Sequence, residues 1–170
     1  MNLKNREIQA CTIIDGIQDE LKSISLFLHN NPELGQQEVR AVQTISRYME
    51  QHGFDTIVGL TKCPELRTAM RSDIGLDRLH KMAFLGEYDA LPELGHGCGH
   101  NLIAIMSMGA AIAFSQIARD TWGTTFFGCP AEETIGGKVF MANEGLFNGY
   151  DGALLLPYLS SFFRGSRHRL

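Results

Sequence analysis

The sequence has 170 residues, enough to bury one hydrophobic core, so a single domain is the simplest expectation. Its 44% hydrophobic and 20% charged residues are typical of globular proteins. The net charge of −4, without a long basic patch, argues against nucleic acid as a partner. We find no signal peptide and no apolar run long enough to cross a membrane, so we expect no membrane partner and a cytoplasmic location.

The first half of the chain predicts two helices and two short strands. Apolar residues at three- and four-residue spacing predict a first helix: Ile13, Ile17, Leu21, Ile24 and Leu28. This helix should end before Pro32, and a second helix is expected over residues 37–52. Residues 54–58 and 67–71 are strand candidates, whereas residues 72–81 have the polarity of a connection.

The second half alternates apolar strands with helices and polar loops. We predict strands over residues 82–88, 124–129 and 152–156, and helices over residues 102–119 and 139–144. This order predicts an α/β fold with a mainly parallel sheet and helices on both faces.

Residues 86–101, between a predicted strand and a predicted helix, are rich in groups that can carry chemistry. Cys98 and His100 are two residues apart, so their side chains point the same way in an extended segment. The four cysteines are too widely spaced for a disulfide framework, which leaves Cys98 reduced and free to act as a ligand. A thiolate and an imidazole together suit a soft or borderline divalent metal, although an isolated Cys-x-His is more often a buried thiol beside a surface histidine.

Three further carboxylates are candidates for the same site. Glu132 and Glu133 follow the next predicted strand, and loops after adjacent parallel strands meet at one edge of the sheet. One glutamate could bind a metal while the other acts on a water, whereas the alternative is ordinary solvated charge. Asp89 is either a loop cap or an acceptor that orients an imidazole or thiolate ligand. His29, with Glu33 nearby, is best interpreted as a cation at a helix C-terminus.

Four motifs together resemble the aminoacylase-like metallopeptidases, which include hippurate hydrolases, auxin-conjugate amidohydrolases, p-aminobenzoyl-glutamate hydrolases and related dipeptidases. The motifs are Leu28-His-Asn-Asn-Pro-Glu-Leu-Gly35, Gly86-Glu-Tyr-Asp-Ala-Leu-Pro92, Gly95-His-Gly-Cys-Gly-His-Asn101, and Pro130-Ala-Glu-Glu133 with Gly136-Gly-Lys138. The resemblance covers residues from about 20 to 157. The wording of the second motif and Asn101 look most like the p-aminobenzoyl-glutamate hydrolase and β-alanyl-lysine dipeptidase branch.

The resemblance implies an aminoacylase-like catalytic domain that holds two divalent ions, Zn or Mn. Cys98, His100 and Glu133 would bind metal, and Glu132 would be the general base and acid. The implied reaction is metal-dependent hydrolysis of the amide bond of an N-acyl or N-aminoacyl amino acid, with a small amide or dipeptide as substrate.

Two departures from the family pattern qualify this implication. Leu156 stands where the family has a metal-binding histidine. The family chain is more than twice as long, so a late metal-binding histidine and the domain through which the family homodimerises have no counterpart here. We therefore expect residues 1–157 to be the truncated amino-terminal part of the catalytic domain, residues 158–170 to be a tail unlike the family, and one ion or none to be retained.

Three functions remain open at this point. The first is an impaired metallo-amidohydrolase. The second is a non-catalytic fragment or an assembly-dependent subunit with a partial metal site. The third, a cysteine hydrolase with Cys98 as nucleophile and His100 as base, is the weakest, because a nucleophilic cysteine usually meets its histidine from a distant segment.

Overall fold

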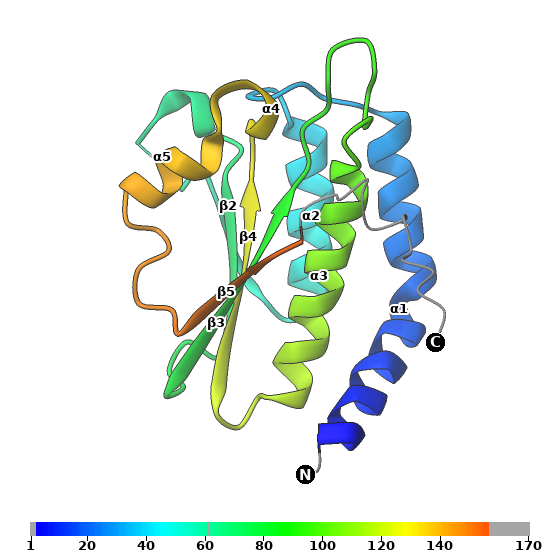
Figure 1. Cartoon of the computed structure of the whole chain (residues 1–170), viewed down its shortest axis with the longest axis vertical. Coiled ribbons are helices and arrows are strands. Elements are labelled where there is room, and N and C mark those ends of the chain that lie inside the picture. The colour runs from blue at the N-terminus through cyan, green and yellow to red at the C-terminus, as the bar shows by residue number, and fades with distance from the viewer. Residues whose placement is uncertain (1–2, 61, 157–170) are drawn as a thin grey trace, which may run out of the picture.

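The computed structural model describes residues 3–60 and 62–156 and contains a five-stranded sheet covered by helices (Figure 1). In chain order the elements are α1 (Leu3–Asn30), α2 (Val39–Gln51), β1 (Asp55–Val58), a 3-10 helix (Pro64–Leu66), β2 (Met70–Ile74), β3 (His80–Glu87), α3 (His100–Ile117), β4 (Trp122–Cys129), α4 (Glu132–Ile135), α5 (Gly137–Asn143) and β5 (Gly152–Leu155).

The strand order is β1-β2-β4-β3-β5. Strand β2 runs opposite to the other four described strands: it pairs antiparallel with β1 and β4, whereas β3 pairs parallel with β4 and β5. The expected α/β fold with a mainly parallel sheet is confirmed. The expected tail, residues 158–170, lies outside the described residues.

Each face of the sheet has its own hydrophobic core. Phe84 and Phe126 are cross-strand partners and lie in the core beneath α1, α2 and α3. Their neighbours Leu85 and Phe127 point to the opposite face and pack with Met141 of α5. Because both faces of β3 and β4 are covered, these strands are apolar without alternation. The prediction of helices on both faces is correct.

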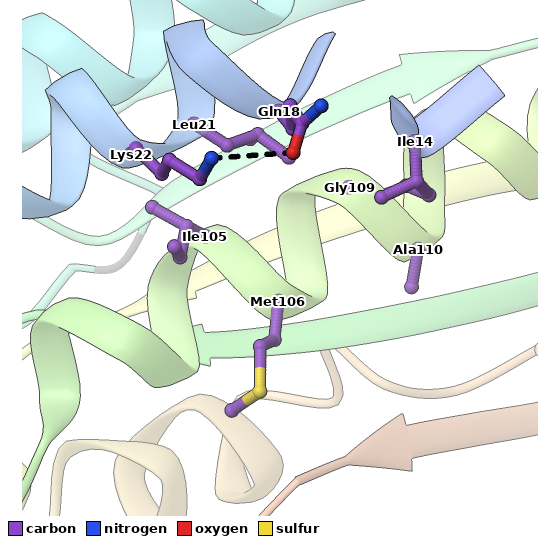
Figure 2. Close-up of a pocket in the computed structure, with 8 residues that line it drawn as sticks. All are labelled: Ile14, Gln18, Leu21, Lys22, Ile105, Met106, Gly109 and Ala110. Carbon is purple, nitrogen blue, oxygen red and sulfur yellow. Dashed lines mark hydrogen bonds between the residues drawn. The ribbon is translucent and has the colours of Figure 1, made fainter. Parts of the chain in front are cut away.

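Helix α1 packs on α3 rather than on the sheet, as Figure 1 shows. A Cβ atom on Gly109 of α3 would lie 3.1 Å from the side chains of Ile14 and Leu21 of α1, so the small residue lets the helices approach. Figure 2 shows these residues along an apolar groove between the two helices, with the hydrogen bond from Lys22 to Gln18, 3.2 Å long, at its border.

Helix α3 corrects one expectation from the sequence. Its 18 residues are long and apolar enough, by length and composition, to span a membrane. More than half of the helix is buried, between α1 and the sheet, which is the position of a core helix.

The polar residues of β2 and the apolar residues of β5 also differ from expectation. Ser72 and Asp73 pair with β4 instead of forming a connection, and Asp73 accepts a hydrogen bond of 2.7 Å from the hydroxyl of Thr125. Because a buried strand residue here is polar and has its hydrogen-bond partner on the neighbouring strand, the sequence of this segment resembles that of a loop. Strand β5, expected to be buried, lies at the edge of the sheet, where Leu154 is 53% exposed.

Candidate active site

Two loops at the same edge of the sheet form the candidate site. Strands β3 and β4 are parallel neighbours, with Glu87 opposite Cys129 at their last paired position. The chain leaves β3 through the long loop that carries Asp89 and Cys98, and it leaves β4 directly into α4; both lie at the upper edge in Figure 1. The structure thus brings the two predicted groups of side chains together.

His100, the first residue of α3, is the buried centre of the site. Its Nδ1 atom lies 2.9 Å from both the main-chain oxygen and Oδ1 of Asp89, so we place the ring hydrogen on Nδ1. The other nitrogen, Nε2, lies 3.4 Å from Glu87, 3.6 Å from Glu133 and 3.8 Å from Glu132. Burial opposes protonation of His100, but the hydrogen bond and charge of Asp89, with the charge of Glu133, raise its pKa above the ordinary value.

Asp89 ties the two loops together. Its second oxygen, Oδ2, accepts the backbone N–H of Glu133 at 2.9 Å, and its side chain is buried. One carboxylate therefore sets the orientation of His100 and the position of Glu133. This is the geometry that the predicted role as an orienting acceptor requires.

The groups face a cavity of about 420 Å³, lined by Glu87, Gly97, Cys98, His100, Ile103, Glu132, Glu133, Lys138 and Leu155. Cys98 hydrogen-bonds to Glu133, and this bond, together with burial and the nearby carboxylates, raises the pKa of the thiol to about 11. Without a metal the thiol is therefore protonated at neutral pH. A divalent cation reverses that preference, because it stabilises the thiolate directly.

The donor atoms fit a divalent ion. One ligand atom each from Glu87, His100 and Glu132 lie within 4.8 Å of one another. An imidazole with carboxylates, and a thiol beside them, is a donor set for Zn or a similar ion. Of the predicted ligands Cys98, His100 and Glu133, this set contains only His100, and it contains Glu87 and Glu132 instead of the other two. Which glutamate binds metal and which acts as the base stays a prediction.

Glu87 and Lys138 also belong to the site, although the sequence pattern predicted no role for either. Glu87 is the last residue of β3 and is buried, and its carboxylate forms an ion pair with the ammonium of Lys138 from α5. Burial lowers the pKa of Lys138 to about 8. Glu87 could have been identified from the sequence as a candidate site residue, because it is a carboxylate at the end of an apolar strand, two residues before Asp89. Leu155 lines the cavity, whereas Leu156, at the position where the resemblance implies a histidine, is not among the lining residues.

Comparison with solved structures finds the same fold in other proteins. A dinuclear metal-binding peptidase of the M20 family from Bacillus subtilis aligns with 82% of this chain and 42% of its own, with a TM-score of 0.70 and 24% identity. An aminobenzoyl-glutamate utilization protein from Klebsiella pneumoniae aligns with 87% of this chain and 46% of its own, with a TM-score of 0.67 and 17% identity. At these identities the likeness concerns the fold. No protein-family model matches the chain.

Sequence comparison gives the family. The chain is 34% identical, over 84% of its length, to the Xaa-Arg dipeptidase of Mus musculus, and 33% identical, over 83%, to a p-aminobenzoyl-glutamate hydrolase component of Escherichia coli. The chain belongs to the aminoacylase-like (M20) metallopeptidases, as its motifs indicated. It spans 36% and 33% of the lengths of these two relatives.

Proposed function

We propose that this protein takes part in the hydrolysis of an amide bond in a small N-acyl or N-aminoacyl amino acid, assisted by a divalent ion. The observation that carries the proposal is the cavity in which Nε2 of the oriented His100 faces Glu87, Glu132 and Glu133. The names of the relatives, which are dipeptidases and amidohydrolases, support the substrate class.

The residues of the site divide the work of binding and proton transfer. His100, Glu133 and Cys98 would hold the ion, which when bound supplies Lewis acidity that polarises the scissile carbonyl and makes water a better nucleophile at neutral pH. The thiol of Cys98 favours Zn over Mn among the ions that suit the other ligands.

Glu132 is our choice for the general base. Its side chain is 38% exposed, compared with 19% for Glu133, so it is the member of the pair that a substrate and its attacking water can reach. Glu132 would take a proton from the water as the carbon–oxygen bond forms. It would return that proton to the leaving amine nitrogen as the carbon–nitrogen bond breaks.

A second candidate is a metal-binding unit that needs further chain for turnover. It is favoured by β5, which among the described residues pairs only with β3 and whose Leu155 both lines the cavity and is 36% exposed. Leu156 in place of an imidazole also removes one ligand expected for a second ion. We therefore expect the chain by itself to hold one ion weakly and to hydrolyse amides slowly.

The test is elemental analysis of the purified chain, with hydrolysis of a panel of N-acyl and N-aminoacyl amino acids in added Zn²⁺ or Mn²⁺. We expect turnover that a chelator abolishes and metal restores. Glu132→Gln should keep the metal, and its turnover rate should fall ~10²–10⁴-fold. Bound metal without turnover would favour the second candidate. Turnover that survives chelation and is blocked by alkylation of Cys98 would refute both in favour of the cysteine hydrolase.

A further inference from the structure

Glu38 is a buried carboxylate outside the cavity whose partners lie far away in the chain. Its Oε1 atom accepts the backbone N–H of Ala131 at 2.7 Å, and its Oε2 atom accepts the hydroxyl of Thr68 at 2.7 Å. Glu38 is fully buried, and each of its two carboxylate oxygens accepts one hydrogen bond. Burial raises the pKa of Glu38 above its ordinary value, and the hydrogen bonds from Thr68 and Ala131 offset only part of the cost of removing a carboxylate from water.

The position of Glu38 in its own helix makes these contacts notable. Glu38 is the N-cap residue of α2, where a carboxylate would ordinarily bond the free N–H groups of the first turn, yet it makes no such bond. Glu33 does that instead, because its carboxylate accepts the N–H groups of Arg40 at 3.1 Å and Ala41 at 2.9 Å. Glu38 is therefore free to reach the loop after β4.

The residue that Glu38 holds, Ala131, directly precedes Glu132 and Glu133. Ala131 has a φ of +57°, in the left-handed region that residues with a Cβ atom rarely adopt. Two residues later, Asp89 accepts the N–H of Glu133. Glu132 is thus bracketed by two buried carboxylates, each bonded to a backbone N–H beside it. A Cβ atom on Gly35 would lie 3.0 Å from the Cα atom of Ala131, so the loop before Glu38 also packs against this segment.

We propose that Glu38 is a positioning residue for Glu132 and Glu133, because its carboxylate holds Ala131 in the left-handed conformation that directs both glutamates towards His100. Without that bond, Ala131 relaxes to an ordinary backbone conformation and the pair turns away from the cavity. The effect on the backbone stands without a metal, whereas the effect on metal binding rests on the function proposed above.

The experiment compares three variants of Glu38 with a matched control. Glu38→Ala removes the carboxylate, and Glu38→Asp keeps the charge but is one methylene too short to reach Ala131. Glu38→Gln keeps the length, with an oxygen for Ala131 and an NH₂ group for the hydroxyl of Thr68. The control is Glu33→Ala, which removes another carboxylate from the same loop. Glu33 caps the first turn of α2 and, unlike Glu38, does not accept the N–H of Ala131. Each variant is measured by urea unfolding, by amide hydrogen exchange in the metal-free chain and by Zn²⁺ titration.

We expect Glu38→Ala and Glu38→Asp to exchange the amides of residues 131–135 at least about tenfold faster relative to the amides of β4, and to bind Zn²⁺ ~10–100-fold more weakly. Glu38→Gln should stay near the native protein in both measurements. Glu33→Ala should lose stability in urea without either local effect. If Glu38→Ala does not fold, Glu38→Asp decides.

Three results would overturn the proposal. One is native exchange over residues 131–135 in Glu38→Asp. Another is an equal local effect in Glu33→Ala, which would make the role a general one in stability. The third is a loss in Glu38→Gln as large as in Glu38→Ala, which would mean that charge acts rather than the hydrogen bond. If the native chain binds no Zn²⁺, the proposed function fails, and the exchange measurement still decides the role of Glu38.

Discussion

Asp89→Asn is the substitution whose consequence can be worked out most fully. The two side-chain oxygens of Asp89 face two donors, Nδ1 of His100 and the N–H of Glu133, each at 2.9 Å. Asparagine has nearly the same shape but one acceptor oxygen, so its NH₂ group must face one of these donors. A buried donor that loses its partner costs ~1–3 kcal/mol.

A second acceptor beside His100 places the expected loss of stability near the lower end of this range. The main-chain oxygen of Asp89 also accepts from Nδ1 of His100, at 2.9 Å, so His100 keeps one partner if the side chain turns its NH₂ group towards the ring. We therefore expect the amide oxygen to stay with Glu133 and the loss of stability to be at the low end, ~1 kcal/mol. Loss of the hydrogen bond and charge of Asp89 also lowers the pKa of His100 and loosens the ring, so Zn²⁺ should bind about tenfold more weakly.

The assay is Zn²⁺ titration of both proteins, with the pKa of His100 followed by NMR in the metal-free state. Asp73→Asn is the matched control, because Asp73 is also a buried carboxylate with two partners, Thr125 and Arg71, but it lies in β2 away from the cavity. It should lower the free energy of unfolding and leave Zn²⁺ affinity unchanged. Unchanged Zn²⁺ affinity in Asp89→Asn, or an equal loss of affinity in Asp73→Asn, would show that Asp89 does not orient His100 for metal binding.

Three other predictions concern the same site. The raised pKa of His100 means that its contribution to metal-free stability is fully present below its unfolded pKa of about 6.5 and is lost as pH rises through the higher folded pKa. The free energy of unfolding in urea, measured between about pH 5 and about pH 9, should show this dependence. A His100→Gln variant should lack it. Lys138→Met leaves the buried Glu87 without its cation and should cost ~3 kcal/mol in urea unfolding, whereas the same substitution at Lys81 should cost far less. Leu156→His should improve Zn²⁺ retention on a desalting column without raising turnover to the level of full-length relatives, and no gain in retention would contradict the ligand position that the resemblance implies.

Much of the local structure follows from the sequence, because helical and strand periodicity are short-range signals. The strand expected over residues 82–88 is β3, His80–Glu87, and the helix expected over residues 102–119 is α3, His100–Ile117. The parallel pairing of β3 with β4 was also predictable, since a strand, a helix and a strand in that order favour a parallel pair. That pairing is enough to bring the loop of Asp89 and His100 beside Glu132 and Glu133.

Other features depend on partners that are distant in the chain. The polarity of Ser72 and Asp73 indicated a connection, and only pairing with β4, which supplies Thr125, makes them a buried strand. Likewise, the apolar run of β5 indicated burial, but it occupies an edge of the sheet, so its leucines are exposed. The polarity of a segment indicates the environment that its residue types have on average. It does not indicate which distant neighbours bury a residue or form its hydrogen bonds.

The family, the two loops of the site and the residue types in those loops could be inferred from the sequence alone. How those residues are held depends on contacts that form only in the folded chain. Glu87 enters the site because β3 ends beside His100, and Glu38 reaches Ala131 across 93 residues because α2 begins next to the loop after β4. Such contacts arise from the packing of whole elements, and a hydrogen bond between residues so far apart leaves no periodic signal in the sequence around either of them.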